Sequence, residues 1–169
     1  ESYDLIITDN TVSYSDELTN KSLAKFLLER FCIIRNTNKG EKNKGIGELD
    51  MLIDVIDKNP VNLDDYKNIT YITARRIFTC PYFFEKTEQL QKEALISNPD
   101  FLYLNGKFIE SHKSGMYNDM IFSMNTETMK KYVEYSKNKL EYLAENQIGS
   151  EQNLYNFIHE NNISHEYLK

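Results

Sequence analysis

Apolar residues in the first half of the chain alternate between short runs and stretches with helical spacing. The runs at 3–8, 31–34 and 69–73 are rich in β-branched and aromatic residues, which predicts three strands. Between them, 15–31 and 45–58 carry apolar residues at i, i+3, i+4 and i+7, the spacing of amphipathic helices. This order of strand, helix, strand, helix, strand is typical of an α/β fold with a mostly parallel sheet flanked by helices.

The helix predicted over 45–58 divides its residues between two faces. Ile46, Leu49 and Leu52 belong to the apolar stripe, whereas Asp50 and two further aspartates are expected to face solvent. Pro60 ends the helix, because proline has no backbone N–H to continue the hydrogen-bond pattern.

The second half of the chain predicts fewer strands and longer helices. The predicted elements are a helix over 85–96, a hairpin over 101–109 around an Asn-Gly turn, a strand over 117–124 and helices over 126–145 and 151–160. Ser150 is expected to cap the last helix, because serine commonly accepts a hydrogen bond from the first turn.

Size and composition favour one soluble domain over 1–169. The 40% hydrophobic content suffices for one ordinary core, and no apolar run approaches the roughly 20 residues of a transmembrane helix. A formal charge of -6 argues against nucleic-acid binding, which needs an extended basic surface. Cys32 and Cys80 lie in or beside apolar runs, so reduced thiols in a cytoplasmic protein are expected. The three histidines are not spaced as zinc ligands and are expected at the surface.

A basic loop is predicted between the second strand and the helix at 45–58. From Arg35 to Gly45 it carries four cations and one anion, a local charge of +3. Glycines, free N–H groups and the positive end of a helix dipole together suit a phosphate or pyrophosphate. A solvated basic turn without a ligand is the alternative interpretation.

Polar residues also follow the other two predicted strands. Asp9, Asn10 and Thr11 end the first strand, and Arg75 and Arg76 come directly after the third. In parallel α/β sheets, ligands bind outside the carboxyl ends of the strands. The three polar groups together therefore predict one shared ligand site.

The strand ending in Asp9 and Asn10, followed by a helix, a strand and the Asn- and Gly-rich loop, resembles the second strand and following unit of GT-A-fold glycosyltransferases. In the second half, the segments from Tyr117 to Phe122, 127–132 and 150–155 are similar to bacterial and viral glycosyltransferases that build surface polysaccharides. The resemblance implies a GT-A-like, Rossmann-like fold.

The same resemblance implies two functional halves, a nucleotide-binding half over 1–80 and an acceptor half over 81–169. The aspartate at the strand end would hold the nucleotide base, and the loop would lie beside the phosphates. A carboxylate can accept a hydrogen bond from a uracil-type N–H, and a lysine can neutralise a pyrophosphate. The implied nucleotide-binding residues are Asp9, Asn10, Thr11, Asn43, Lys44 and Gly45.

Two departures from the family pattern alter the expected mechanism. The family's first strand and helix are missing, so the chain is expected to begin partway into the domain. The Asp-x-Asp pair that would bind Mg²⁺ or Mn²⁺ is replaced by a segment containing Arg75 and Arg76. We expect a metal-independent site in which either arginine stabilises the departing diphosphate, with a divalent cation as the alternative. Pairing of these arginines with acidic helix faces is a further alternative.

Glycosyl transfer also needs a carboxylate that deprotonates the acceptor hydroxyl. The candidates are Asp119 and Glu151. Asp119 is preferred, because Glu151 would stabilise the dipole of its helix whatever the function. Tyr117, beside Asp119, is placed to contact the acceptor sugar.

The sequence thus predicts an enzyme that moves a sugar from a nucleotide-sugar donor to a glycan acceptor, in the cytoplasm or peripheral to the membrane. Another nucleotide-binding α/β enzyme, such as a nucleotidyltransferase, would use the same strand-end groups. A catalytically inactive binding or assembly module is a third possibility, favoured by the missing Asp-x-Asp pair and the missing first strand.

Overall fold

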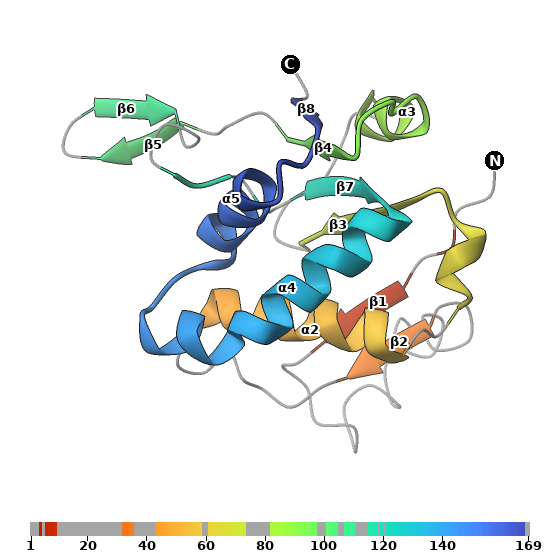
Figure 1. The fold of residues 1–169 in the computed structure, drawn as a ribbon, viewed down its shortest axis with the longest axis horizontal. Coiled ribbons are helices and arrows are strands. Elements are labelled where there is room, and N and C mark those ends of the chain that lie inside the picture. Colours follow the sequence, from red (N-terminus) through yellow and green to blue (C-terminus); the bar gives the residue numbers. More distant parts are fainter. Residues whose placement is uncertain are drawn as a thin grey trace, which may run out of the picture.

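The computed structural model describes residues 4, 6–9, 32–35, 43–58, 61–73, 82–97, 101–104, 107–110, 115–117, 119 and 121–167. The elements in chain order are β1 (Ile6–Asp9), β2 (Cys32–Arg35), α2 (Lys44–Lys58), the 3₁₀ turn η2 (Leu63–Asp65), β3 (Asn68–Ile72), α3 (Tyr82–Glu88), β4 (Ala94–Ile96), β5 (Phe101–Leu104), β6 (Lys107–Glu110), β7 (Ile121–Asn125), α4 (Thr126–Glu145), α5 (Ser150–Glu160) and β8 (His165–Tyr167). Figure 1 shows their arrangement. The helix predicted over 15–31 lies outside the described residues.

Several predicted elements are confirmed. The helices α2, α4 and α5 match the apolar stripes at 45–58, 126–145 and 151–160. The predicted hairpin is the antiparallel pair β5–β6, in which Leu104 lies opposite Lys107. The cap of α5 is shifted by one residue, because Gly149 is the N-cap and makes no side-chain hydrogen bond. Ser150 is instead the first residue of the helix and is buried.

A four-stranded mixed sheet runs through the upper part of the molecule in Figure 1, in the order β3-β7-β4-β8. The central strand β7 is antiparallel to both β3 and β4, whereas β4 and β8 are parallel. The strand β8 was not predicted, since three residues are too few for an alternating pattern to stand out. The fold is α/β, as expected, but its main sheet is mixed.

The prediction of a mostly parallel sheet is wrong, because the third predicted strand has a different partner. β1 and β2 do pair in parallel, with Asp9 and Arg35 in register at their ends. β3 instead pairs antiparallel with β7, which lies about 50 residues further along the chain. Opposite each other in this register, Tyr71 and Phe122 bring their ring centroids to 5.2 Å. Such a cross-strand aromatic pair is a long-range contact that local periodicity does not reveal.

The helix predicted over 85–96 is also wrong in its second part. α3 ends at Glu88, and Ala94–Ile96 form the strand β4, which is buried on both faces. Ala94 and Ile96 pack into the main core, whereas Leu95 packs into a second cluster with Phe83 of α3. A strand buried on both sides is a continuous apolar run, which periodicity cannot distinguish from a buried helix.

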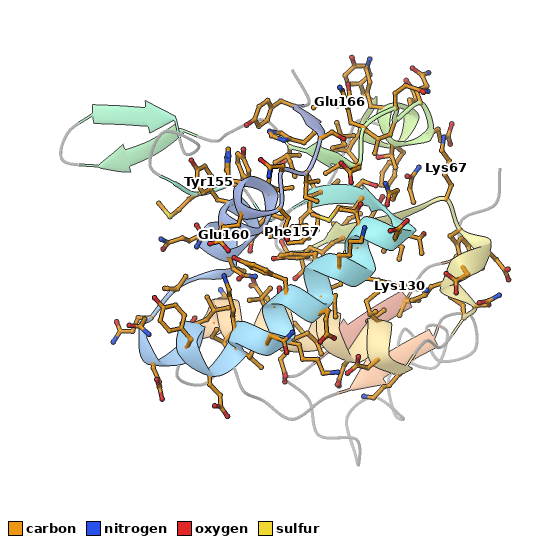
Figure 2. All side chains as sticks on the ribbon, in the orientation of Figure 1. Lys67, Lys130, Tyr155, Phe157, Glu160 and Glu166 are labelled. Atoms are coloured by element: carbon orange, nitrogen blue, oxygen red, sulfur yellow. The ribbon has the colours of Figure 1, made fainter. Side chains whose placement is uncertain are left out.

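The main core lies between the mixed sheet and three helices. In Figure 1, α4 runs between the sheet above and α2 below, and the pair β1–β2 lies against α2. Figure 2 shows Phe157 of α5 pointing toward α4. Phe157 is 1% exposed, and its ring packs against those of Tyr132 and Tyr135 of α4. Burial of one such aromatic side chain contributes about 1.5–3 kcal/mol.

Asp50 of α2 does not face solvent, contrary to the prediction. It is 5% exposed, because α2 packs against α4, α5, β1 and β2 rather than against a single partner. A single apolar stripe predicts one buried face, so it does not anticipate a helix that is covered on several sides.

A carboxylate clasp holds β8 to the rest of the sheet. One oxygen of Glu93 accepts hydrogen bonds from the backbone N–H of Ser164 at 2.9 Å and from its hydroxyl at 2.8 Å. The backbone N–H of Glu93 donates to the Ser164 carbonyl at 2.9 Å. The two hydrogen bonds that the carboxylate accepts, led by the one from the Ser164 backbone, lower the pKa of Glu93 below its usual 4.5.

The clasp predicts a loss of stability in acid. Because the folded-state pKa of Glu93 is depressed, its contribution is present above pH 4.5 and is lost as the pH falls through the folded-state pKa. We expect Glu93→Gln to lower the urea midpoint at pH 7 and to flatten its pH dependence between about pH 5 and pH 3. Glu145→Gln, at an exposed carboxylate of α4, is the control and should leave both unchanged. An unaltered pH profile for Glu93→Gln would contradict the role of the clasp.

Candidate active site

The first turns of α2 and α5 meet at Gly45. A Cβ atom built on Gly45 would lie 2.7 Å from the backbone nitrogen of Ser150 and 3.2 Å from the Cα of Gly149. A side chain at this position would therefore collide with backbone, and glycine allows the two helix starts to touch. The positive ends of two helix dipoles consequently lie side by side.

Each of the three loop residues implied as phosphate ligands has a defined position. Asn43 accepts a hydrogen bond through its side-chain oxygen from the N–H of Ile46 at 3.4 Å, as a helix-capping residue does. Lys44 begins α2 and is exposed. Gly45 makes the contact with Ser150. The structure thus places the Lys44 cation at the surface beside the helix junction, next to the capping residue Asn43.

Asp119 and Ser150 of this junction line the same cavity. Asp119 is 5% exposed, and the walls of this small cavity come from α2, α5, α4 and the paired strands β3 and β7. The cavity has a volume of about 10 Å³, which is at the lower limit for one water molecule. Its lining residues are Glu48, Leu49, Leu52, Tyr71, Asp119, Phe122, Tyr132 and Ser150.

The two tyrosines of the cavity remain protonated at physiological pH. Burial raises the pKa of Tyr71 and Tyr132, and the nearby charge of Asp119 raises both further. Tyr132 also receives a hydrogen bond from the amide of Asn153 at 3.4 Å, and that amide donates to Ser136 of α4 at 2.8 Å. The cavity wall is therefore fixed by a buried polar link between α4 and α5.

Glu151, the other carboxylate candidate, lies at the surface in the first turn of α5. A Cβ on Gly149 would lie 2.7 Å from its Oε2 atom, so the carboxylate folds back over the start of its own helix. This position stabilises the helix dipole. The carbonyl of Glu151 accepts a hydrogen bond from the N–H of Tyr117 at 3.1 Å, which ties the segment carrying Asp119 to the start of α5.

The other predicted site residues are placed only in part. Asp9 ends β1, whose pair with β2 packs against α2. Asn10, Thr11, Arg75 and Arg76 lie outside the described residues. Because β3 belongs to a different sheet from β1 and β2, the expectation that the segment after β3 shares a sheet edge with Asp9 no longer holds.

Tyr117 does not extend toward the expected acceptor region. Its side chain is 1% exposed, and its hydroxyl meets His159 Nε2 at 3.0 Å, His165 Nε2 at 3.3 Å and Tyr167 Oη at 2.8 Å. Burial raises the pKa of Tyr117, and burial followed by the proximity of His165 lowers that of His159. Part of this cluster could have been found from the sequence, since residues 165 and 167 of a strand point to the same face.

Comparisons with known proteins return no relative. No family model matches the chain, and neither a curated protein nor a solved structure does. Within the described part of the chain, no helix is long and apolar enough to cross a membrane. The same residues hold no group of three or more histidine, cysteine, aspartate or glutamate side chains suited to a metal ion.

The contact at Gly45 predicts an unusual response to alanine. In a free helix, Gly→Ala stabilises by about 1 kcal/mol. Here we expect Gly45→Ala to lower the free energy of unfolding by about 1–3 kcal/mol, because the methyl group would press on the backbone of Ser150. Urea denaturation measures the change, with Lys44→Ala at the exposed neighbouring position as the control. A stabilised Gly45→Ala protein would show that the two helix starts do not touch.

Proposed function

We propose that this chain acts as a glycosyltransferase domain that moves a sugar from a nucleotide sugar to a glycan hydroxyl. The observation that carries the proposal is the junction of the α2 and α5 starts, with Lys44 at its surface and Asp119 in the cavity that Ser150 also lines. A nucleotide sugar needs cations and N–H groups for its diphosphate and a carboxylate near the reacting carbon. The groups that would meet these two requirements, Lys44 with the start of α2 and Asp119, lie about 70 residues apart in the sequence.

On the donor side, the diphosphate would lie over the first turn of α2. Lys44 supplies a cation there, and the start of the helix supplies the positive end of its dipole. The base would lie toward Asp9, at the end of the parallel pair that packs on α2. This parallel pair followed by α2 is the part of the fold that supports a GT-A-like arrangement. Arg75 and Arg76 would offset the charge of the leaving diphosphate.

In the transfer step, the acceptor oxygen attacks the anomeric carbon of the sugar while the bond from that carbon to the diphosphate oxygen breaks. The acceptor proton passes to a carboxylate. We assign this role to Asp119, which would receive the proton through the single water that its cavity can hold. The cytoplasm, with its reducing conditions for Cys32 and Cys80, is the proposed setting.

An inactive nucleotide-binding module is the second candidate. The observation in its favour is the burial of Asp119, which leaves no direct path for an acceptor hydroxyl to the carboxylate. Such a module would retain the donor side of the junction and would lack transfer activity.

Nucleotide binding predicts thermal stabilisation. A ligand at one hundred times its Kd adds about 2.7 kcal/mol, which corresponds to a Tm increase of about 5–10 °C for a chain of this length. We expect this shift with at least one sugar conjugate of UDP, GDP or CMP, and we expect Lys44→Ala to weaken binding about tenfold. Lys92→Ala, at an exposed lysine before β4, is the matched control. The absence of a shift with every nucleotide would overturn both candidate functions.

If Asp119 is the catalytic base, a variant at this position should lose sugar transfer but retain nucleotide binding. Asp119→Asn keeps the shape of the side chain but cannot take up a proton, so transfer should fall about 10²- to 10⁴-fold while the nucleotide Tm shift remains. Glu151→Gln should retain turnover within about tenfold. Initial rates of sugar transfer to a glycan acceptor measure both variants, with circular dichroism as the check on folding. Full turnover by Asp119→Asn would remove Asp119 from the mechanism, and inactive wild-type protein that binds a nucleotide would favour the module.

A further inference from the structure

Two imidazoles and two phenols converge at the end of α5. Tyr117 comes from the segment before β7, His159 from the last turn of α5, and His165 and Tyr167 from β8. From Tyr117 Oη, the distances are 3.0 Å to His159 Nε2, 3.3 Å to His165 Nε2 and 2.8 Å to Tyr167 Oη. His165 Nε2 and Tyr167 Oη are 3.2 Å apart. We call these four residues the His/Tyr cluster.

We propose that the His/Tyr cluster binds a divalent transition-metal ion of the zinc class. A tetrahedral site with bonds of about 2.0–2.1 Å to nitrogen or oxygen has ligand atoms about 3.3 Å apart. Four of the six donor–donor distances, the three from Tyr117 Oη and the one between His165 and Tyr167, fall between 2.8 and 3.3 Å. The ring centroids of His159 and His165 are 6.2 Å apart on either side of Tyr117 Oη, so an outward movement of the donors would make room for the ion. Two of the four donors are phenols, so the cluster differs from sites built from histidine, cysteine and carboxylate ligands alone.

The orientation of His165 supports a ligand role. Its Nδ1 lies 3.0 Å from the carbonyl oxygen of Ile163, so the N–H of Nδ1 donates to that carbonyl and Nε2 carries the free electron pair. Metal-binding histidines are commonly held in this way, with the second ring nitrogen donating to a backbone carbonyl. The electron pair of Nε2 is therefore directed at the phenol oxygens.

Aromatic packing fixes the second imidazole. The ring centroid of Tyr155 lies 4.2 Å from that of His159, and the ring of Tyr117 stacks on His159 at 5.9 Å. Figure 2 shows Tyr155 on the side of α5 opposite Phe157, where it is partly buried and packs against the main core. Tyr155, which is not one of the four donors, thus helps to hold the ring of His159 in place, and this lowers the cost of ordering the ring around an ion.

The donor set selects the class of ion. Imidazole nitrogens favour zinc, copper, nickel or iron, whereas magnesium and calcium prefer carboxylate and carbonyl oxygens. Glu166, between His165 and Tyr167, is exposed and lies on the other face of β8. Each phenol that binds as a phenolate releases one proton to solvent, and two phenolates would balance the charge of the ion. This chemistry differs from that of a magnesium ion bound to a diphosphate.

Metal titration of chelator-treated full-length chain tests the proposal without any nucleotide. We expect Co²⁺ to bind with a stoichiometry of one and to give the visible absorption of a tetrahedral complex, which Zn²⁺ should abolish by displacement. Zn²⁺ should raise the Tm, Mg²⁺ should not, and binding in weak buffer should release protons. His165→Gln and Tyr167→Phe should each weaken Zn²⁺ binding at least about tenfold.

Tyr155→Phe is the matched control. It keeps the ring that packs on His159 and removes a hydroxyl outside the donor set, so it should bind Zn²⁺ like the wild type. If His165→Gln does not fold by circular dichroism, Tyr167→Phe decides the result, because it removes one oxygen atom only. The absence of a cobalt spectrum and of a zinc-induced Tm shift in the wild type would overturn the proposal. Equal Zn²⁺ binding by Tyr167→Phe and Tyr155→Phe would also overturn the proposal. The four residues would then form a hydrogen-bonded cluster that does not bind the ion.

Discussion

The contact between Gly45 and the backbone of Ser150 is the constraint on which the site depends. It holds the starts of α2 and α5 against each other, and the cavity that they line exists because both helices contribute to its wall. Asp119 is enclosed there and is 5% exposed. A larger residue at position 45 would separate the helices, open the cavity and change the environment of the carboxylate in one step.

The mixed sheet then determines which segments reach this junction. The strand β7 pairs with both β3 and β4, and the segment just before it carries Tyr117 and Asp119. On the far edge, β8 is anchored by the Glu93–Ser164 clasp and returns His165 and Tyr167 toward α5. The start of α2, the segment before β7 and the strand β8 consequently reach α5 at Ser150, Glu151 and His159, respectively. Long-range pairing of this kind provides rigidity that a helix start alone would lack.

Local patterns in the sequence predicted the helices better than the sheet. The stripes of α2, α4 and α5 repeat over several turns, so their spacing identifies both the element and its buried side. The strand β4 was taken for the end of a helix, because burial on both faces removes the alternation that marks a strand. For the site, the sequence suggested Lys44 and Gly45 for the nucleotide and, separately, Asp119 for the acceptor, whereas the partners of Tyr117 required β8, a strand with no pattern of its own.

Tyr117 links the start of α5 to the His/Tyr cluster, because its backbone and its side chain form hydrogen bonds with different groups. Its N–H donates to the carbonyl of Glu151 at the start of α5, while its hydroxyl lies in the His/Tyr cluster near the end of the same helix. Asp119 is two residues away, so its position depends on both attachments. An ion in the cluster would hold Tyr117 more firmly and restrict the carboxylate to one geometry. Conversely, loss of the cluster would loosen Asp119 without changing the first turn of α2, so the order of the proposed base and the proposed binding of a nucleotide would be affected separately.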